Sequence, residues 1–173
     1  YEIMPSLVGS EMCIRDRYRP IAESYLTEWL GITYPPGTWR TNVALGDVKT
    51  PELMTMTPAE ARFVKQPLRP IADAVVVLPD EVHLVECKIR DDRGKIEQLL
   101  IYEYLFPKTP EYKPHWDKRI RKILLTPKDV GGLAKFLEKY GIEVVYYRPP
   151  WILEYLGSIR RRERRAMGYS VEF

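Results

Sequence analysis

The stretch IADAVVVLPDEVHLVECKIR, residues 71–90, constrains the fold of this chain more than any other. Two valine-rich runs flank the turn sequence LPDE, in which Pro79 followed by Asp80 suits a type I turn within a four-residue loop. A two-residue primed turn is disfavoured, because proline cannot take the positive φ that such a turn requires. The stretch therefore predicts an antiparallel hairpin with strands at 70–78 and 82–90.

Charged residues interrupt both strands of this hairpin, at Asp73, Glu86 and Lys88. A four-residue loop pairs Val77 with Val82, and counting outward from that pair places Asp73 opposite Glu86. Directly opposed residues share a face of the sheet, with Cβ atoms about 4.5–5.5 Å apart. Because side chains alternate along a strand, Lys88 lies on the same face as Glu86. The hairpin therefore predicts two carboxylates and an ammonium group gathered on one face.

Paired carboxylates at this separation repel each other strongly in a half-buried setting. A stable fold tolerates them if one is protonated or if a cation lies between them, and an adjacent lysine does not neutralise both. Oxygen ligands of this kind suit Mg²⁺ or Mn²⁺ and not Zn²⁺. The hairpin thus predicts a hard-metal site on the sheet. The alternative is an ion-pair cluster on an exposed sheet face, which the flanking valine and isoleucine runs disfavour.

The remaining elements alternate along the chain. Apolar periodicity, capping residues and turn residues predict a helix at 18–32, a long connection with one or two short strands at 33–55, a short helix at 57–66, a helix at 93–106, a strand at 118–127, a helix at 129–141, a strand at 142–149 and a helix at 151–167. A hairpin followed by this alternation favours an α/β fold, with a central mixed β-sheet flanked by helices on both faces.

Length and composition fit one domain with a sizeable core: 173 residues, 45% apolar and 29% charged. The net charge of +3 does not by itself argue for a nucleic-acid partner. The two cysteines, Cys13 and Cys87, have no metal-ligand spacing and indicate no disulfide framework, so a reducing, cytoplasmic compartment is expected. No apolar run reaches the roughly 18–20 residues of a membrane span, and no signal-peptide pattern opens the sequence.

The first residues have the sequence of a processing artefact. The chain begins at Tyr1, and MPSLVGSEMCIRDR at 4–17 looks like a translated sequencing-adapter read-through. We therefore expect residues 1–17 to be non-native and one domain to occupy 18–173. The alternative is a genuine flexible arm.

The hairpin residues resemble the core motif of the PD-(D/E)XK nuclease superfamily. Asp73, twelve intervening residues and then Glu86-Cys87-Lys88 match its Asp…Glu-x-Lys pattern, with Ala72 in place of the proline. The resemblance implies a restriction-endonuclease-like core in which Asp73 and Glu86 bind Mg²⁺ or Mn²⁺ and Lys88 positions or activates the attacking water. It also implies hydrolysis of DNA phosphodiester bonds.

A second motif lies on the predicted helix that follows the hairpin. Gln98 and Tyr102 are four residues apart on one helix face, and QLLIY resembles the Gln-x-x-x-Tyr motif of RecB-type exonucleases. The resemblance implies that this pair helps to organise the catalytic site and the nucleic acid strand. It further implies an acidic residue on the first helix, for which Glu23 is the candidate and Glu28 the reserve. Glu23 and the backbone carbonyl of Cys87 would complete the metal ligands.

Positive charge concentrates late in the chain, in KRIRK at 118–122 and RRRERR at 160–165. Such clusters are expected to bind the DNA backbone without sequence preference, although solvated helix ends have the same composition. The expected nucleic-acid-binding residues are Lys118, Arg119, Arg121, Lys122, Arg160, Arg161 and Arg162. His83 faces away from Glu86 and is expected to be structural. His115 lies in the loop TPEYKPHWDKR, whose mixture of aromatic and basic residues suits contacts with single strands.

Together these features predict a Mg²⁺-dependent deoxyribonuclease, either an exonuclease or a single-strand-directed nuclease. The alternatives are a Holliday-junction resolvase or restriction-type endonuclease, a nucleic-acid-binding module with a nuclease fold but no turnover, and a structural α/β protein with a surface acid cluster. A homodimer would favour the resolvase, and the sequence leaves the oligomeric state open. DNA repair, recombination, phage and mobile-element settings all fit.

Overall fold

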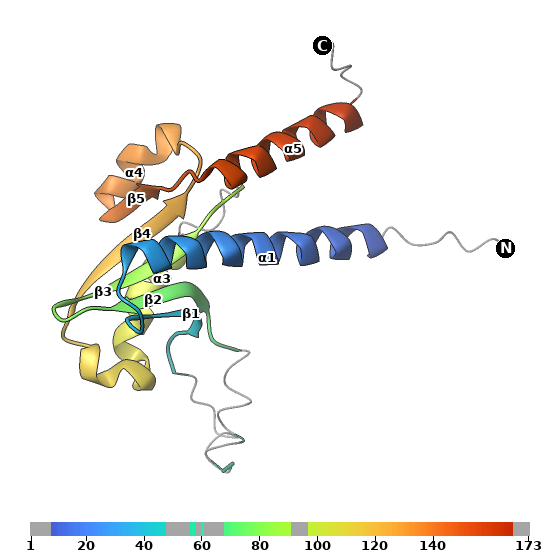
Figure 1. The fold of residues 1–173 in the computed structure, drawn as a ribbon. Helices are drawn as coiled ribbons and strands as arrows, with labels where there is room; N and C mark the ends of the chain where they lie inside the picture. Colours follow the sequence, from blue (N-terminus) through green and yellow to red (C-terminus); the bar gives the residue numbers. More distant parts are fainter. Residues whose placement is uncertain (1–7, 48–55, 58–59, 61–67, 91–96, 168–173) are drawn as a thin grey trace.

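The computed structural model describes residues 8–47, 56–57, 60, 68–90 and 97–167. Among these residues a five-stranded sheet forms the centre, in the order β1-β2-β3-β4-β5 (Figure 1). The strands are β1 (Trp39–Ala44), β2 (Ile71–Val77), β3 (Glu81–Cys87), β4 (Arg119–Thr126) and β5 (Ile142–Tyr146). The first three pair antiparallel, whereas β4 and β5 continue the sheet parallel to β3. The predicted mixed sheet is therefore confirmed.

Helices cover both faces of the sheet, as predicted for an α/β fold. They are α1 (Val8–Thr33), α3 (Glu97–Leu105), α4 (Ala134–Lys139) and α5 (Pro150–Ala166), with 3₁₀ turns η4 (Phe106–Lys108), η5 (Pro110–His115) and η6 (Gly131–Leu133). On one face Tyr25 of α1 and Ile152 of α5 are buried in the same core, and on the other Leu99 of α3 and Leu137 of α4 are. α1 and α5 extend beyond the sheet (Figure 1). No helix in the described ranges is both long and apolar enough to cross a membrane.

The hairpin formed by β2 and β3 has the predicted register. The paired residues are Val77 with Val82, Val76 with His83, Val75 with Leu84 and Ala74 with Val85. β3 nevertheless ends at Cys87, earlier than the predicted strand end at 90. The Cys87 N–H donates to the carboxylate of Asp73 at 2.7 Å. This backbone N–H is therefore not available for a further hydrogen bond between β2 and β3.

Other element boundaries differ from the predicted ones. α1 begins at Val8, so the adapter-like residues 8–17 are helical here and do not form an irregular arm. α3 begins at Glu97, and residues 93–96 of the predicted helix lie outside the described residues. The predicted helix at 129–141 begins only at Gly131, which takes a positive φ of 52°, and it consists of η6 followed directly by a short α4.

The strands and the C-terminal helix agree more closely. β4 and α5 lie within one residue of the predicted ends at 118–127 and 151–167, whereas β5 stops at Tyr146, short of the predicted end at 149. β1 is a strand of the predicted connection at 33–55. Of the predicted helix at 57–66, residues 58–59 and 61–66 lie outside the described part of the chain.

Candidate active site

Asp73 and Glu86 come from neighbouring strands and lie at the same end of the sheet. Asp73 precedes Ala74 on β2, and Glu86 follows Val85 on β3. Ala74 and Val85 form the last pair of the β2–β3 ladder at this end, so the two carboxylates lie just beyond it. The Oδ2 atom of Asp73 accepts the hydrogen bond from the Cys87 N–H at 2.7 Å, which holds this carboxylate against β3. Glu86 is 3% exposed. The structure thus brings the two predicted carboxylates together at the carboxyl end of β3.

Glu86 is hydrogen-bonded through both of its carboxylate oxygens. The Lys88 ammonium donates to Oε1 at 2.6 Å, and the Tyr102 hydroxyl lies 3.1 Å from Oε2. The same hydroxyl is 2.7 Å from the carbonyl oxygen of Ile71, so two acceptors share its one proton. Lys88 and Tyr102 therefore fix the orientation of the Glu86 side chain.

The environment makes the negative charge on Glu86 unfavourable. Burial raises the pKa of Glu86, and the charge of Asp73 raises it further, while Lys88 and Tyr102 lower it by less. Burial also raises the pKa of Tyr102, and the two carboxylates add to this shift, so the phenol remains a neutral donor. A cation bound between the carboxylates would remove most of this cost, because it offsets the repulsion that raises the pKa.

Gln98 lies one helical turn before Tyr102 on α3. Its side-chain oxygen, Oε1, is buried and has no hydrogen-bond partner among the residues that the structure describes. Leaving such a group unsatisfied costs about 1–3 kcal/mol, and among the described residues Trp39, Arg69 and His115 also carry a buried polar atom without a partner, so this oxygen does not by itself identify a ligand site. The two residues of the predicted Gln-x-x-x-Tyr pair therefore differ: Tyr102 contacts Glu86, whereas Gln98 has hydrogen-bonding capacity left over.

The donor set at this edge suits a hard divalent cation with few protein ligands. The Cys87 carbonyl and the Lys88 N–H belong to one peptide group. This N–H donates to the Leu125 carbonyl at 2.8 Å, so the Cys87 carbonyl, a predicted metal ligand, is held in place. Within the described residues, no group of three His, Cys, Asp or Glu side chains could hold a metal ion. Mg²⁺ commonly takes one or two carboxylates and completes its shell with waters and substrate phosphate, so Asp73 and Glu86 fit it.

The acidic residues expected from the first helix are placed differently. Glu23 is exposed on α1, and in the described part of the chain it forms no metal-ligand group with Asp73 and Glu86. The carboxylate of Glu28 accepts hydrogen bonds from the Tyr147 hydroxyl and from Trp151 Nε1, the latter at 2.8 Å. Glu28 therefore joins α1 to the segment between β5 and α5.

The first basic cluster begins at the opposite end of the sheet. In the parallel register Arg119 is level with Glu81 at the start of β3, about 16 Å along the strand from Glu86. Each of the four basic side chains has a partner: Lys118 the Leu78 carbonyl, Arg119 and Arg121 the Glu81 carboxylate, and Lys122 the Glu103 carboxylate. The register thus places Lys118 and Arg119 away from the acidic pair, whereas Lys122 is level with Leu84, two residues before Glu86. The second cluster, at 160–162, is exposed on α5.

Neither histidine joins the acidic pair. His83 is buried, with Nδ1 2.8 Å from the Tyr34 hydroxyl and Nε2 2.7 Å from Glu81, which is the structural role expected for it. His115 lies in η5, on the segment that leads into the start of β4.

Two basic residues at the carboxyl edge of the sheet were not among the predicted site residues. Arg90 follows Lys88 by two residues, and Lys128 follows the last residue of β4 by two. Their proximity was predictable from the sequence, because each follows one of two parallel strands, and the carboxyl ends of parallel strands meet at one edge of a sheet. Together with residues of α5 they line a cavity of about 230 Å³.

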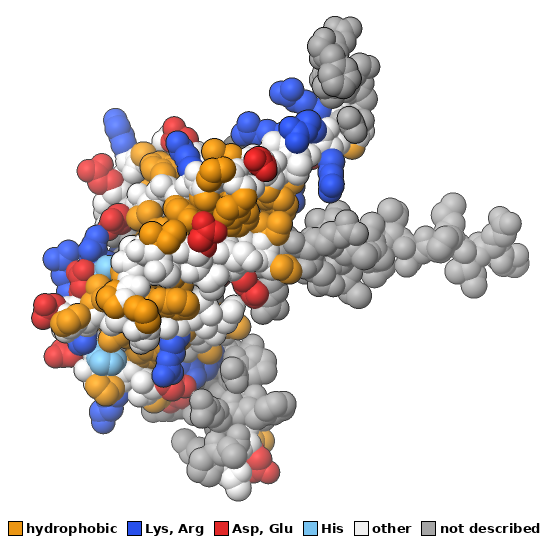
Figure 2. Space-filling view, in the orientation of Figure 1, with side chains coloured by type: hydrophobic (Ala, Val, Ile, Leu, Met, Phe, Trp, Pro, Cys, Tyr) orange, Lys and Arg blue, Asp and Glu red, His pale blue; other side chains and the backbone are white. Residues whose placement is uncertain are grey.

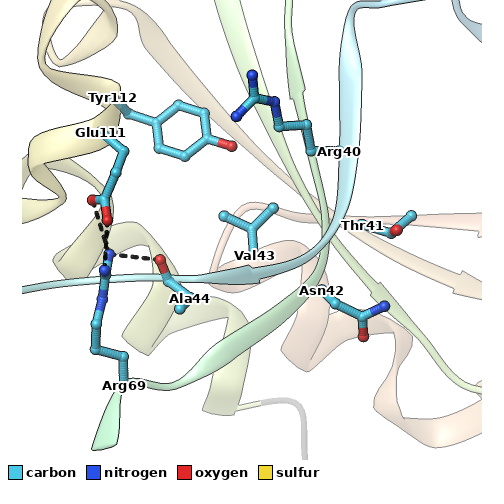
Figure 3. A pocket seen from close by; sticks show the side chains of 8 residues that line it. All are labelled: Arg40, Thr41, Asn42, Val43, Ala44, Arg69, Glu111 and Tyr112. Carbon is cyan, nitrogen blue, oxygen red and sulfur yellow. Dashed lines mark hydrogen bonds and ion pairs between the residues drawn. The ribbon is translucent and has the colours of Figure 1, made fainter. Parts of the chain in front are cut away.

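A second cavity, of about 210 Å³, lies beside the edge strand β1 (Figure 3). Arg69 donates to both carboxylate oxygens of Glu111, at 2.7 and 3.1 Å, and to the Ala44 carbonyl at 2.7 Å. The Arg40 guanidinium and the Tyr112 hydroxyl lie toward each other across the cavity (Figure 3). These contacts attach the segment before β2 and the turn η5 to β1.

The comparisons with known proteins give limited similarity. No family model matches the chain, and no curated protein matches it. A crystal structure of a repair endonuclease from Pyrococcus abyssi is 28% identical over 46% of this chain and 34% of that one, with a TM-score of 0.35. A structure of an EndoMS complex with double-stranded DNA is 18% identical over 75% of this chain and 45% of that one, with a TM-score of 0.43. The chain spans less than half of either protein, and at these TM-scores neither similarity establishes a function.

Tyr102→Phe tests whether this phenol positions Glu86. Losing the hydroxyl removes a donor that lowers the pKa of Glu86, so that pKa is expected to rise. We expect stability to fall by about 1 kcal/mol, and the pH-dependent loss of stability that Glu86 causes to extend to higher pH. Urea unfolding measured across pH checks both expectations.

Tyr25→Phe is the matched control for this experiment. The Tyr25 hydroxyl is also buried and donates to a backbone carbonyl, that of Tyr147, at 2.6 Å. It should cost similar stability and leave the pH profile of stability unchanged. Equal pH profiles for both variants would show that Tyr102 has no effect on Glu86.

Proposed function

We propose that this chain is a metal-dependent nuclease that hydrolyses phosphodiester bonds of DNA. The observation that carries the proposal is the environment of Glu86: a buried carboxylate beside Asp73, held by Lys88 and Tyr102. Structural ion pairs are normally arranged so that each charge is favourable. Here two carboxylates share one edge and the pKa of one is raised, which is typical of a site completed by a cation.

Each residue of the site has a distinct part in the proposed reaction. A bound Mg²⁺ or Mn²⁺ would supply Lewis-acid polarisation of the scissile phosphate. Asp73, Glu86 and the Cys87 carbonyl would hold the ion. Lys88 keeps its ammonium next to Glu86, where it stabilises the negative charge that develops as water attacks phosphorus. Tyr102 positions Glu86.

Gln98 and Tyr102 favour an exonuclease or a single-strand-directed nuclease within this class. The unsatisfied, buried Gln98 oxygen on the same helix face supports a contact with the nucleic acid strand. A Holliday-junction resolvase and a restriction-type endonuclease use the same carboxylates and differ in substrate. A binding module that has lost turnover would need no Lys88 at the carboxylates.

A cleavage assay tests the proposal. Labelled single-stranded, duplex and four-way-junction DNA are incubated with the protein and Mg²⁺, Mn²⁺ or EDTA. We expect cutting with either metal, none in EDTA, and preference for single strands or strand ends. Preference for the junction would identify a resolvase.

A negative result is informative when binding is measured in parallel. DNA binding without cutting in either metal would contradict the nuclease proposal and favour the binding module. Cutting that persists in EDTA would contradict the metal site.

A further inference from the structure

The cavity at the carboxyl edge of the sheet is lined largely by cationic side chains. Its lining residues are Arg90, Lys128, Leu156, Ile159, Arg160 and Glu163. They come from three segments: the residues that follow β3, the residues that follow β4, and the outer half of α5. Lys and Arg side chains also gather on the part of α5 that extends from the body of the molecule (Figure 2). The cavity therefore lies where the sheet edge meets a basic helix.

This cavity lies at the same end of the sheet as the acidic pair, although its lining helix α5 packs on the face opposite to α3, whose Tyr102 contacts Glu86. The Lys88 N–H donates to the Leu125 carbonyl at 2.8 Å, so the two chain segments that lead to Arg90 and Lys128 run side by side past the site. Arg90 is four residues from Glu86, and an extended chain of that length spans at most about 14 Å. DNA rises about 3.4 Å per nucleotide along each strand, so the cavity lies within roughly four nucleotides of a phosphate held at Glu86.

Unlike Arg119, Arg121 and Lys122, two of these cations are not neutralised by a carboxylate. Within the described part of the chain, the Lys128 ammonium and the Arg160 guanidinium form no ion pair. Arg90 donates to Glu163 Oε1 at 2.8 Å, and the two side chains are 41% and 50% exposed. An ion pair this exposed is weak, so a phosphate group that enters the cavity can displace Glu163 from Arg90.

We infer that Arg90, Lys128 and Arg160 form a phosphate-binding subsite that holds the backbone of the DNA strand beside the cut. The inference rests on the proposed nuclease function for the identity of the polyanion. In the free protein Glu163 occupies the position of the phosphate at Arg90. The strand accordingly leaves the acidic pair toward α5, away from the first basic cluster.

The salt dependence of DNA binding tests this subsite. Binding is measured in EDTA, so that no strand is cut, with single-stranded and duplex DNA between about 50 and 200 mM salt. Lys128→Ala with Arg160→Ala is expected to weaken binding roughly 10-fold near 0.1 M salt. Loss of two phosphate contacts should also lower the slope of log K against log salt by roughly 1.5. Glu163→Gln removes a competing carboxylate and is expected to tighten binding roughly two- to fivefold.

A charge-matched control comes from the other end of the sheet. Lys108→Ala with Lys139→Ala removes the same charge from exposed positions in η4 and α4. This variant should leave the salt slope unchanged. The inference is overturned if the two double variants lower the slope equally, if Lys128→Ala with Arg160→Ala leaves it unchanged, or if the parent protein binds no DNA.

The subsite and the nuclease proposal can fail separately. An unchanged salt slope in the Lys128→Ala, Arg160→Ala variant, together with metal-dependent cutting by the parent, would contradict the subsite and support the nuclease proposal. A reduced slope in that variant, together with no cutting by the parent in Mg²⁺ or Mn²⁺, would support the subsite and contradict the nuclease proposal.

Discussion

Replacing Glu86 by glutamine is expected to reduce metal-dependent DNA cleavage roughly 10³-fold while making the metal-free protein more stable. The amide keeps the shape of the side chain: its oxygen can accept from Lys88 and its NH2 can donate to the Tyr102 hydroxyl, whose proton then goes to the Ile71 carbonyl. It removes one of the two charges that hold the metal ion. In the metal-free protein that charge is unfavourable, because burial and Asp73 together outweigh Lys88. The free energy of unfolding at pH 7 should therefore rise, on the order of 1 kcal/mol.

The pH dependence of stability follows from the same raised pKa. Between the ordinary glutamate value of 4.5 and the higher pKa of Glu86 in the folded state, the folded protein binds more protons than the unfolded one. The contribution of Glu86 to the stability of the metal-free parent should therefore be most favourable below pH 4.5. It should be lost as pH rises through the raised pKa. Urea unfolding across pH should show this fall in the parent and not in Glu86→Gln.

Glu81→Gln is the matched control on the same strand. Glu81 accepts hydrogen bonds from His83 and Arg121, and the His83 contact in particular lowers its pKa. Its charge is favourable, so the substitution should not stabilise the metal-free protein, and cleavage should persist. A Glu86→Gln protein that is less stable than the parent, or still cuts at the parent rate, would mean that Glu86 belongs to a structural ion cluster.

Lys88→Met is expected to lower cleavage by roughly 10²- to 10³-fold and to destabilise the metal-free protein. Lys88 lowers the pKa of Glu86, so its removal raises that pKa further and leaves the buried carboxylate without its cation. The stability cost at pH 7 is limited to about 3 kcal/mol, because Glu86 can take up a proton instead. The two members of one ion pair are thus expected to shift stability in opposite directions.

Lys122→Met provides a control that matches Lys88 in burial and geometry. The Lys122 side chain is 9% exposed and donates to Glu103 at 2.6 Å, compared with 14% and 2.6 Å for Lys88 and Glu86. Lys122 lies in the middle of β4, level with Leu84, and its ammonium is paired with Glu103 and not with Glu86. Cleavage should be retained in this variant. Equal loss of activity in both lysine variants would point to a general effect on folding, which unfolding curves would register.

The hairpin shows how much of the candidate site the sequence could predict. A proline-containing turn determines the loop length, and the two-residue period of a strand then determines which side chains share a face. Asp73 and Glu86 are close in the chain, so local geometry alone predicts that they meet, and the observed register of β2 and β3 agrees. The mixed sheet was predictable for a similar reason, because each element carries its own periodicity.

The basic residues show where sequence reasoning stops. Both clusters have the same composition, yet one lies beside the start of β3 with its charges paired and the other on α5 near the carboxyl edge. Nothing local distinguishes them, because their placement depends on the parallel register of β3 and β4 and on where α5 packs. Arg90 and Lys128 are separated widely in the chain and meet only through that register.

The sequence by itself determined the hairpin, its register and the pairing of two carboxylates with a lysine, since turn geometry and side-chain alternation act over a few residues. Tertiary structure decided the rest: that Tyr102 reaches Glu86, that the Gln98 side-chain oxygen is buried with no partner among the described residues, that Glu28 is used elsewhere, and which cations lie at the carboxyl end of the sheet. Those contacts depend on how helices pack against the sheet. Packing free energy is summed over the whole core and is not encoded in any short stretch.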